Sequence, residues 1–278
     1  MNSDQPRGIE VIRPLSPRRF RFVLFDFDGT LSLLREGWVS IMIPLEVEAL
    51  APLETGLPPD QLRTLLTNDI DELTGCPTMD QMIRLANRVR QFGGTPPSPR
   101  EYKAEYNRRL LAHIAGRREA LAAGTVPPDE MLLPGARPLL EALFARGLVL
   151  CLASGTDEPY VREEAALLDI ARYFGPHIYG ARDEGEASSK PSVIMRLLGE
   201  NRVRGEELLV FGDGFVEIES GRRVGGYAVG VASDEAAGGG RIDSWKRDRL
   251  LRAGADAIVP DFARHQELLR WLFPPQGT

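Results

Sequence analysis

The 278-residue chain has only two cysteines and three histidines. Cys76 and Cys151 lie far apart without the spacing of zinc-ligand pairs, and Cys151 falls in an apolar run typical of a buried strand. The histidines (His113, His177 and His265) show neither clustering nor the spacing of a catalytic triad. These features do not indicate a disulfide framework, a zinc site or histidine-based nucleophilic catalysis, and they favour a reducing, cytoplasmic setting.

Long apolar runs and a basic excess are also missing. The best apolar runs, residues 20–27 and 148–153, have the length of strands, whereas a membrane span needs roughly 18 apolar residues. The N-terminus lacks the apolar core of a signal peptide. The net charge is -6, so the basic face typical of nucleic-acid binders is not expected. With 43% hydrophobic and 27% charged residues, the composition is that of a globular protein with no membrane or nucleic-acid partner.

Residues 34–134 differ from the rest of the chain because apolar residues recur there at helical intervals and strand-like runs are scarce. Thr78 with Gln81, and Ser98 with Glu101, have the spacing of capping boxes. The sequence therefore predicts helices that begin at Thr78 and Ser98, the second running to about residue 123.

Beyond residue 134, strand-like and helix-like segments alternate. The predicted strands are 22–25, before the helical block, and 148–153, 177–179, 207–211, 227–231 and 256–259, after it. Strands separated by helices predict a parallel sheet with right-handed crossovers. The predicted fold class is therefore α/β, with a Rossmann-like parallel sheet as the core and an inserted α-helical domain. The core comprises residues 1–33 and 135–278, with 1–19 as an extended arm, and the insertion comprises 34–134.

Polar groups follow several of the predicted strands, at the edge of a parallel sheet where function collects. They are Asp26 and Asp28 after the first strand, Ser154 and Gly155 after the second, Lys190 at the start of a helix, and Asp213 and Glu217 after the strand at 207–211. Two carboxylates at one strand end are unsuited to a plain core, because buried carboxylates need partners. A carboxylate can attack phosphorus, and a second acid can protonate the leaving oxygen and then activate water. Gathered hard oxygen ligands suit Mg²⁺.

These segments resemble the motifs of the haloacid dehalogenase superfamily. FDFDGT at 25–30 matches its first motif, LASGT at 152–156 its second, the lysine of SSKPS its third, and FGDGFVE at 211–217 its fourth. The resemblance implies that Asp26 is the nucleophile and Asp28 the general acid and base. It further implies a phosphate site at Ser154, Gly155 and Lys190, and Mg²⁺ held by Asp26, Asp28, Asp213 and Glu217. The last residue stands where Asp is commoner, and it is expected to act through water.

The acid at position 28 favours phosphate ester hydrolysis or phosphomutation within this superfamily, because an alkoxide leaving group needs a proton. The resulting prediction is a phosphatase with a C1-type helical cap that acts on a small phosphorylated metabolite. A sugar phosphomutase and a non-catalytic binding or regulatory protein on the same scaffold are the alternatives. The loop between Thr74 and Thr78 precedes a helix N-terminus that could face an anion, so these two residues are candidate specificity residues. An ordinary helix connection is the competing interpretation, and the particular ester and the oligomeric state stay open.

Overall fold

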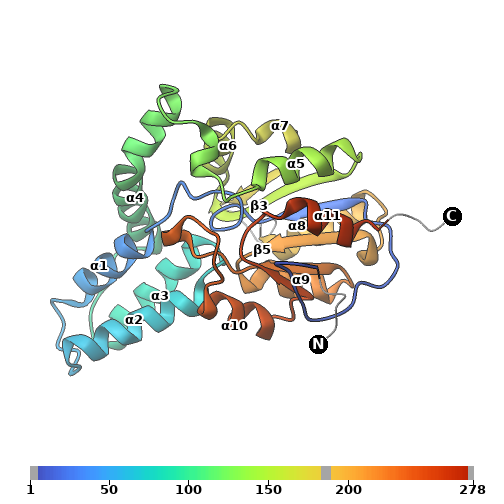
Figure 1. The fold of residues 1–278 in the computed structure, drawn as a ribbon. Coiled ribbons are helices and arrows are strands. Elements are labelled where there is room, and N and C mark those ends of the chain that lie inside the picture. The colour runs from blue at the N-terminus through green and yellow to red at the C-terminus, as the bar shows by residue number, and fades with distance from the viewer. Residues whose placement is uncertain (1–5, 183–188, 275–278) are drawn as a thin grey trace.

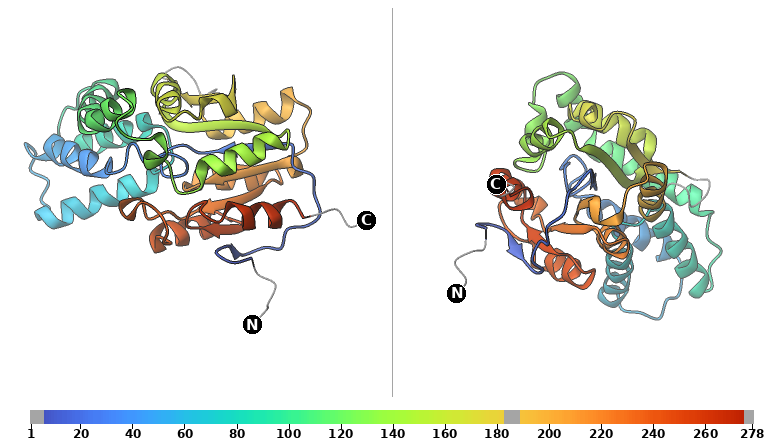
Figure 2. Two further views of the ribbon diagram at one scale, coloured as in Figure 1. Left: turned by 45° about the horizontal axis from the view of Figure 1, so that its top comes forward. Right: turned by 90° about the vertical axis from the view of Figure 1, so that its right-hand side faces the viewer.

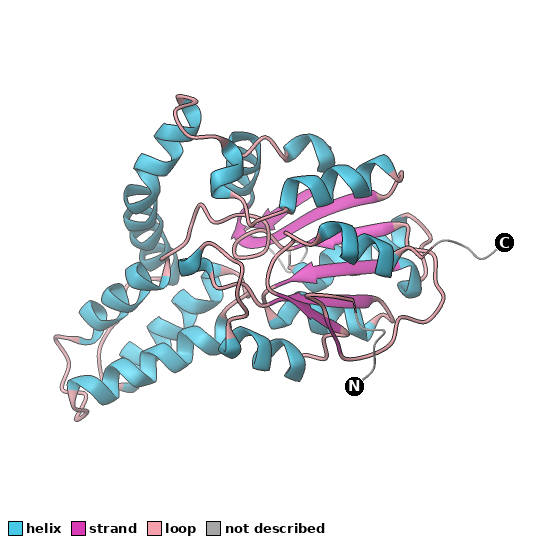
Figure 3. Ribbon diagram, in the orientation of Figure 1, coloured by secondary structure: helices cyan, strands magenta, loops and turns pink. Residues whose placement is uncertain are grey.

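The computed structural model describes residues 6–182 and 189–274. Its centre is a seven-stranded sheet in the order β1-β7-β6-β5-β2-β3-β4, in which all neighbours are parallel except β1 and β7 (Figure 3). The strands are β1 Glu10–Val11, β2 Phe22–Phe25, β3 Val149–Asp157, β4 Ile178–Ala181, β5 Leu208–Gly212, β6 Tyr227–Val231 and β7 Ala257–Val259. The predicted α/β fold with a mostly parallel sheet is confirmed.

Strand β2 is fully buried and lies between β3 and β5. Phe25, at its end, pairs with Leu152 of β3 on one side and with Phe211 of β5 on the other. The three strands therefore end at one edge of the sheet, on either side of the point where the strand order reverses. Such a point is where ligands bind in open α/β sheets.

The sequence interpretation missed one strand and predicted another too short. Within the segment 1–19, expected as an extended arm, Glu10–Val11 pairs with β7 as an antiparallel edge strand. Two residues are too few to produce a recognisable alternation in the sequence. The strand expected to end at residue 153 continues to Asp157 and so includes Ser154 and Gly155.

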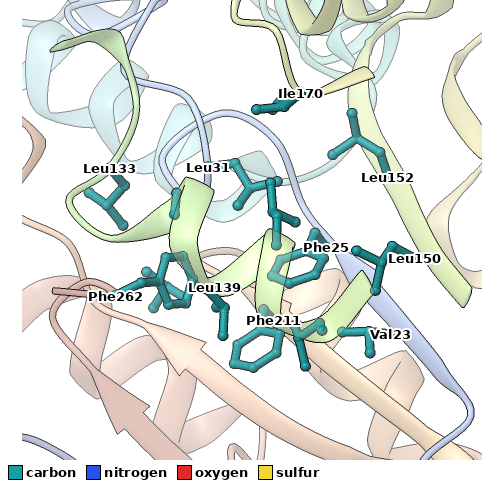
Figure 4. Packing of buried hydrophobic residues seen from close by; sticks show 14 of the residues in the cluster. Val23, Phe25, Leu31, Leu133, Leu139, Leu150, Leu152, Ile170, Phe211 and Phe262 are labelled. Atoms are coloured by element: carbon teal, nitrogen blue, oxygen red, sulfur yellow. The ribbon is translucent and has the colours of Figure 1, made fainter. Parts of the chain in front are cut away.

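Helices cover both faces of the sheet (Figures 1 and 2). One face packs against α5 Ala136–Ala145, α6 Glu158–Leu167, α7 Ala171–Phe174 and α11 His265–Leu272, and the other against α8 Lys190–Glu200, α9 Phe215–Arg223 and α10 Ser244–Arg252. In the first of these cores the rings of Phe25 and Phe211 stack with centroids 4.9 Å apart, and Phe262 meets both rings edge-on (Figure 4). Burial of these rings stabilises the strands whose ends carry the polar groups.

Four helices lie apart from the sheet with a hydrophobic core of their own, and we call them the helical lobe (Figure 1). They are α1 Val39–Leu50, α2 Pro59–Leu73, α3 Thr78–Gln91 and α4 Pro99–Ala122. The chain enters and leaves the lobe side by side, since Leu33 N donates to Met131 O at 2.9 Å and Leu133 N donates to Leu31 O at 2.9 Å. Among the described helices, none combines the length and the apolar character that a membrane crossing requires.

The two capping boxes have different outcomes. Ser98 and Glu101 form theirs at the start of α4. The box expected at Thr78 is absent, because Pro77 takes the N-cap position of α3 and Thr78 is already helical. Gln81 is buried instead of reaching back to the cap.

Candidate active site

Asp26 lies directly after β2 and is 5% exposed. Its backbone N–H donates to the carbonyl of Phe211 at 2.9 Å, which extends the pairing with β5 by one residue. Burial raises the pKa of Asp26 well above its usual value, and Lys190 opposes this rise. The side chain is therefore fixed at the sheet edge, where its ionisation depends on nearby cations.

Lys190 supplies such a cation from the first residue of α8. Its Nζ lies 2.8 Å from Asp26 Oδ1 and 2.8 Å from Glu217 Oε2. Burial alone would favour the neutral amine, but the carboxylates of Asp26 and Glu217 outweigh it and raise the pKa of Lys190. The ammonium group thus stays charged at the place where the sequence predicts a phosphate.

Three carboxylates converge at this edge. Oxygens of Asp26, Asp213 and Glu217 all lie within 4.8 Å of one another. Buried carboxylates so close repel unless a cation or protons compensate them, and hard oxygen ligands are what Mg²⁺ prefers. The residues therefore fit a divalent cation. Glu217 is also engaged elsewhere, because its Oε1 accepts the N–H of Gly214 at 2.7 Å and its Oε2 meets Lys190.

Asp28 faces the end of β3. Thr156 Oγ1 donates to Asp28 Oδ2 at 3.0 Å, and Ser154 Oγ donates to the same oxygen at 3.3 Å. Asp28 Oδ1 has no hydrogen-bond partner among the described residues. Gly155 lies beside the helical lobe, because a Cβ on it would come within 2.6 Å of the Cys76 carbonyl oxygen.

The sequence interpretation missed an ion pair beside Asp28. Arg35 is buried and donates to Glu164 from Nε at 2.9 Å and from Nη2 at 2.8 Å, while its Nε lies 4.0 Å from Asp28 Oδ1. A signal existed, since Glu164 shares a helical face with the apolar Val161 and Leu168. A carboxylate on such a face needs a partner, but the sequence does not name that partner.

A second missed cation is Lys246 on α10. Its Nζ lies 2.8 Å from Asp213 Oδ2, 2.5 Å from Glu235 Oε1 and 3.2 Å from Ser233 Oγ. Burial opposes ionisation of Asp213, but the Lys246 ammonium outweighs it and lowers the pKa of Asp213. No local pattern distinguishes Lys246 from a surface lysine.

A cavity of about 100 Å³ joins these groups to the helical lobe. The residues on its wall that the sequence singled out are Asp26, Asp28, Thr74, Thr78, Ser154, Gly155, Lys190 and Asp213. Thr74 Oγ1 donates to the carbonyl of Ile70 at 2.9 Å, so its hydroxyl is already bonded within the chain. Glu217 is not on the wall, and it reaches the cavity through Lys190.

The fold and the site define a family. Haloacid dehalogenase-like hydrolases match residues 20–225, which span most of the chain and include the ends of β2, β3 and β5 and the start of α8 described above. The chain belongs to this family of hydrolases.

The individual relatives share about a quarter of their residues with this chain. The chain is 27% identical over 220 residues to phosphoglycolate phosphatase of Salmonella typhimurium, covering 77% of this chain and 82% of that protein. It is also 27% identical over 217 residues to phosphoglycolate phosphatase of Escherichia coli K12, covering 76% and 81%.

Solved structures share the fold across both parts of the molecule. Beta-phosphoglucomutase of Clostridium difficile superposes with a TM-score of 0.61 at 14% identity, covering 91% of this chain and 97% of that one. A predicted phosphoglycolate phosphatase of Haemophilus somnus gives a TM-score of 0.57 at 18% identity, covering 90% and 97%.

Proposed function

We propose that the protein hydrolyses a small phosphate monoester through an aspartyl-phosphate intermediate. The observation that carries the proposal is the buried Asp26 carboxylate, 2.8 Å from Lys190, with Asp28 two residues on at the same sheet edge. Phosphoryl transfer depends mainly on positioning and on neutralisation of charge, and both are built into this arrangement. The names of the relatives support a phosphatase.

The chain's own groups account for each step. An oxygen of Asp26 attacks phosphorus, and the bond from phosphorus to the ester oxygen breaks as Asp28 protonates that oxygen. Water then attacks the aspartyl phosphate, gives a proton to Asp28 and releases inorganic phosphate. Lys190 and the Ser154–Gly155 segment hold the phosphoryl oxygens and stabilise their charge.

Mg²⁺ is the cofactor that suits the carboxylates. We assign Asp26, the backbone carbonyl of Asp28 and Asp213 as its ligands, with Glu217 assisting through water. When bound, the cation supplies charge that offsets the repulsion between the carboxylates and the phosphate. Glu217 also accepts a hydrogen bond from Lys190, so it positions the ammonium group that binds the phosphate in this proposal.

The helical lobe, within residues 34–134, acts in this proposal as a C1-type cap over a core of 1–33 and 135–278. A Cβ added to Gly75, in the loop between Thr74 and Thr78, would lie only 3.3 Å from Gly214 Cα, so this loop, which we call the lobe loop, packs directly on the core. Arg249 of the core donates to the carbonyl of Thr74 at 3.1 Å and lies over the ring of Phe215. Opening these contacts would admit substrate, and closing them would exclude bulk water from the reaction.

The substrate in this proposal is a small phosphorylated metabolite, since the cavity measures only about 100 Å³ and the relatives are named as phosphatases of a small phosphate ester. A cytoplasmic location agrees with two unpaired cysteines, of which Cys151 is buried and Cys76 partly so. Burial raises the pKa of the Cys151 thiol to about 12, which makes it unreactive.

Release of inorganic phosphate from p-nitrophenyl phosphate tests the proposal. We expect turnover with Mg²⁺, its loss in EDTA and its recovery when Mg²⁺ is added back. EDTA-insensitive hydrolysis would contradict the metal assignment. A protein that instead interconverts sugar phosphates and requires a bisphosphate activator would be a phosphomutase, and a protein that does neither would be a binding or regulatory protein.

A further inference from the structure

The helical lobe supplies a largely apolar section to the wall of the cavity described above, beside the polar Thr74, Thr78 and Gln81. Trp38, Met42, Tyr106 and Leu110 line it, and the last three are each 4% exposed or less. Met42 belongs to α1, and Tyr106 and Leu110 belong to α4. In a phosphatase of this architecture the core holds the phosphate, so this wall faces the remainder of the ester. An apolar wall favours a carbon-rich or ring-shaped alcohol.

The positive charge near this wall is already compensated. Arg35 lies between Glu164, at 2.8 Å and 2.9 Å, and Asp28, at 4.0 Å. Lys190, the other cation among the described residues on the cavity wall, lies between Asp26 and Glu217. A leaving group with a carboxylate or a second phosphate would bring a negative charge into a site with no spare cation, and a buried unpaired charge is costly.

Gln81 offers a different kind of contact. It lies on the cavity wall, is 6% exposed, and its Oε1 has no hydrogen-bond partner among the described residues. A buried acceptor without a partner is unfavourable, so this oxygen is ready for a donor from a ligand. A hydroxyl or N–H on the leaving alcohol would satisfy it.

We infer that the substrate is the phosphate ester of an uncharged alcohol that has an apolar or ring-shaped body and a hydrogen-bond donor for Gln81. This inference rests on the proposed phosphatase function and narrows its substrate class. It separates the chain from the phosphoglycolate phosphatases among its relatives, because phosphoglycolate carries a carboxylate.

Steady-state kinetics of the 278-residue protein with Mg²⁺ test the inference on three esters. Benzyl phosphate offers a ring, 4-(hydroxymethyl)benzyl phosphate adds a donor, and 2-phosphoglycolate has a carboxylate in place of the ring. We expect kcat/KM to be at least about tenfold higher for benzyl phosphate than for 2-phosphoglycolate, a ratio that corresponds to about 1.4 kcal/mol. The added hydroxyl should raise kcat/KM further.

Substitutions in α3 then test whether Gln81 is the residue that accepts the hydrogen bond from the substrate's hydroxyl. Gln81→Leu should lower kcat/KM for the hydroxymethyl ester about tenfold more than for benzyl phosphate, the factor that corresponds to about 1.4 kcal/mol. Gln91→Leu is the matched control, because Gln91 is exposed at the end of the same helix and should leave both values unchanged. Thermal unfolding of both variants separates this selective effect from loss of the fold.

The possible results are distinguishable. A preference for 2-phosphoglycolate, or an equal loss on both ring esters in Gln81→Leu, would overturn the inference while leaving a working phosphatase. Absence of hydrolysis of every ester, including p-nitrophenyl phosphate, would overturn the proposed function and the inference with it.

Discussion

Lys190 Nζ and Glu217 Oε2 lie 2.8 Å apart, and the two side chains come from the first turns of the packed helices α8 and α9. Glu217 is fully buried, so this contact contributes to the fold as well as to the site. The same ammonium group also binds Asp26, and one cation therefore compensates two buried carboxylates.

Lys190→Met should lower the free energy of unfolding, because it leaves the carboxylates of Asp26 and Glu217 buried without their cation. Breaking a buried ion pair costs about 3–5 kcal/mol, which urea unfolding in EDTA would detect. The double variant Lys190→Met/Glu217→Gln removes one of the stranded charges and should recover part of that loss. If the losses of unfolding free energy measured for Lys190→Met and for Glu217→Gln alone simply add up in the double variant, the pairing contributes little.

Asp26→Asn should reduce phosphate release to below about 1% of wild type, because the amide cannot serve as the nucleophile. Circular dichroism should show that the fold persists. Asp60→Asn is the matched control, since Asp60 is exposed in the first turn of α2. Residual turnover of Asp26→Asn well above that level would remove Asp26 from the nucleophile's role.

Asp28→Asn should slow hydrolysis of alkyl phosphates by roughly 10²–10⁴-fold, the usual contribution of a general acid and base. The loss on p-nitrophenyl phosphate should be smaller, because nitrophenolate leaves without a proton. Comparing kcat on the two kinds of ester measures the difference. Equal losses on both would argue against protonation by Asp28.

The two threonines of the lobe loop should behave differently. Thr74 Oγ1 is bonded to the carbonyl of Ile70, so Thr74→Ala should leave the ranking of substrates nearly unchanged. Thr78→Ala removes a hydroxyl-bearing side chain from the cavity wall at the start of α3 and should change that ranking. Ratios of kcat/KM over a panel of phosphate esters test this pair of variants. If both variants rank the esters as the wild type does, the loop is an ordinary connection.

Stability of the helical lobe should depend on pH through Glu46. Burial, with a further contribution from Asp69, raises the pKa of Glu46 from 4.5 to about 8. Between pH 4.5 and about 8, Glu46 holds a proton in the folded state that it has lost in the unfolded state. The free energy of unfolding therefore falls as pH rises towards 8. The slope should be on the order of 1.4 kcal/mol per pH unit.

Glu46→Gln keeps the shape and removes the charge, so the variant should lack this slope. Urea unfolding of both proteins between about pH 5 and pH 8 measures the difference. Parallel pH profiles for the two proteins would mean that Glu46 ionises normally in the folded state.

Local sequence was sufficient for much of the fold. The run Phe22–Phe25 is apolar throughout and is followed by Asp26 and Asp28, so both the strand and the polar groups after it were recognisable. The box at Ser98 was found because its partner lies three residues away. The box predicted at Thr78 was wrong because Pro77 moved the helix start by one residue.

What the sequence by itself determined is therefore the order of strands and helices, the α/β class and the residues proposed for the phosphate and metal sites. Their recognition needs only neighbours in the chain and the rule that parallel strands end at one edge. Tertiary structure alone decided that Arg35 meets Glu164, that Lys246 meets Asp213, and that Gln81 reaches the cavity. The partners in the first two pairs are 129 and 33 residues apart, and no periodic pattern links groups that only the packing of whole helices brings into contact.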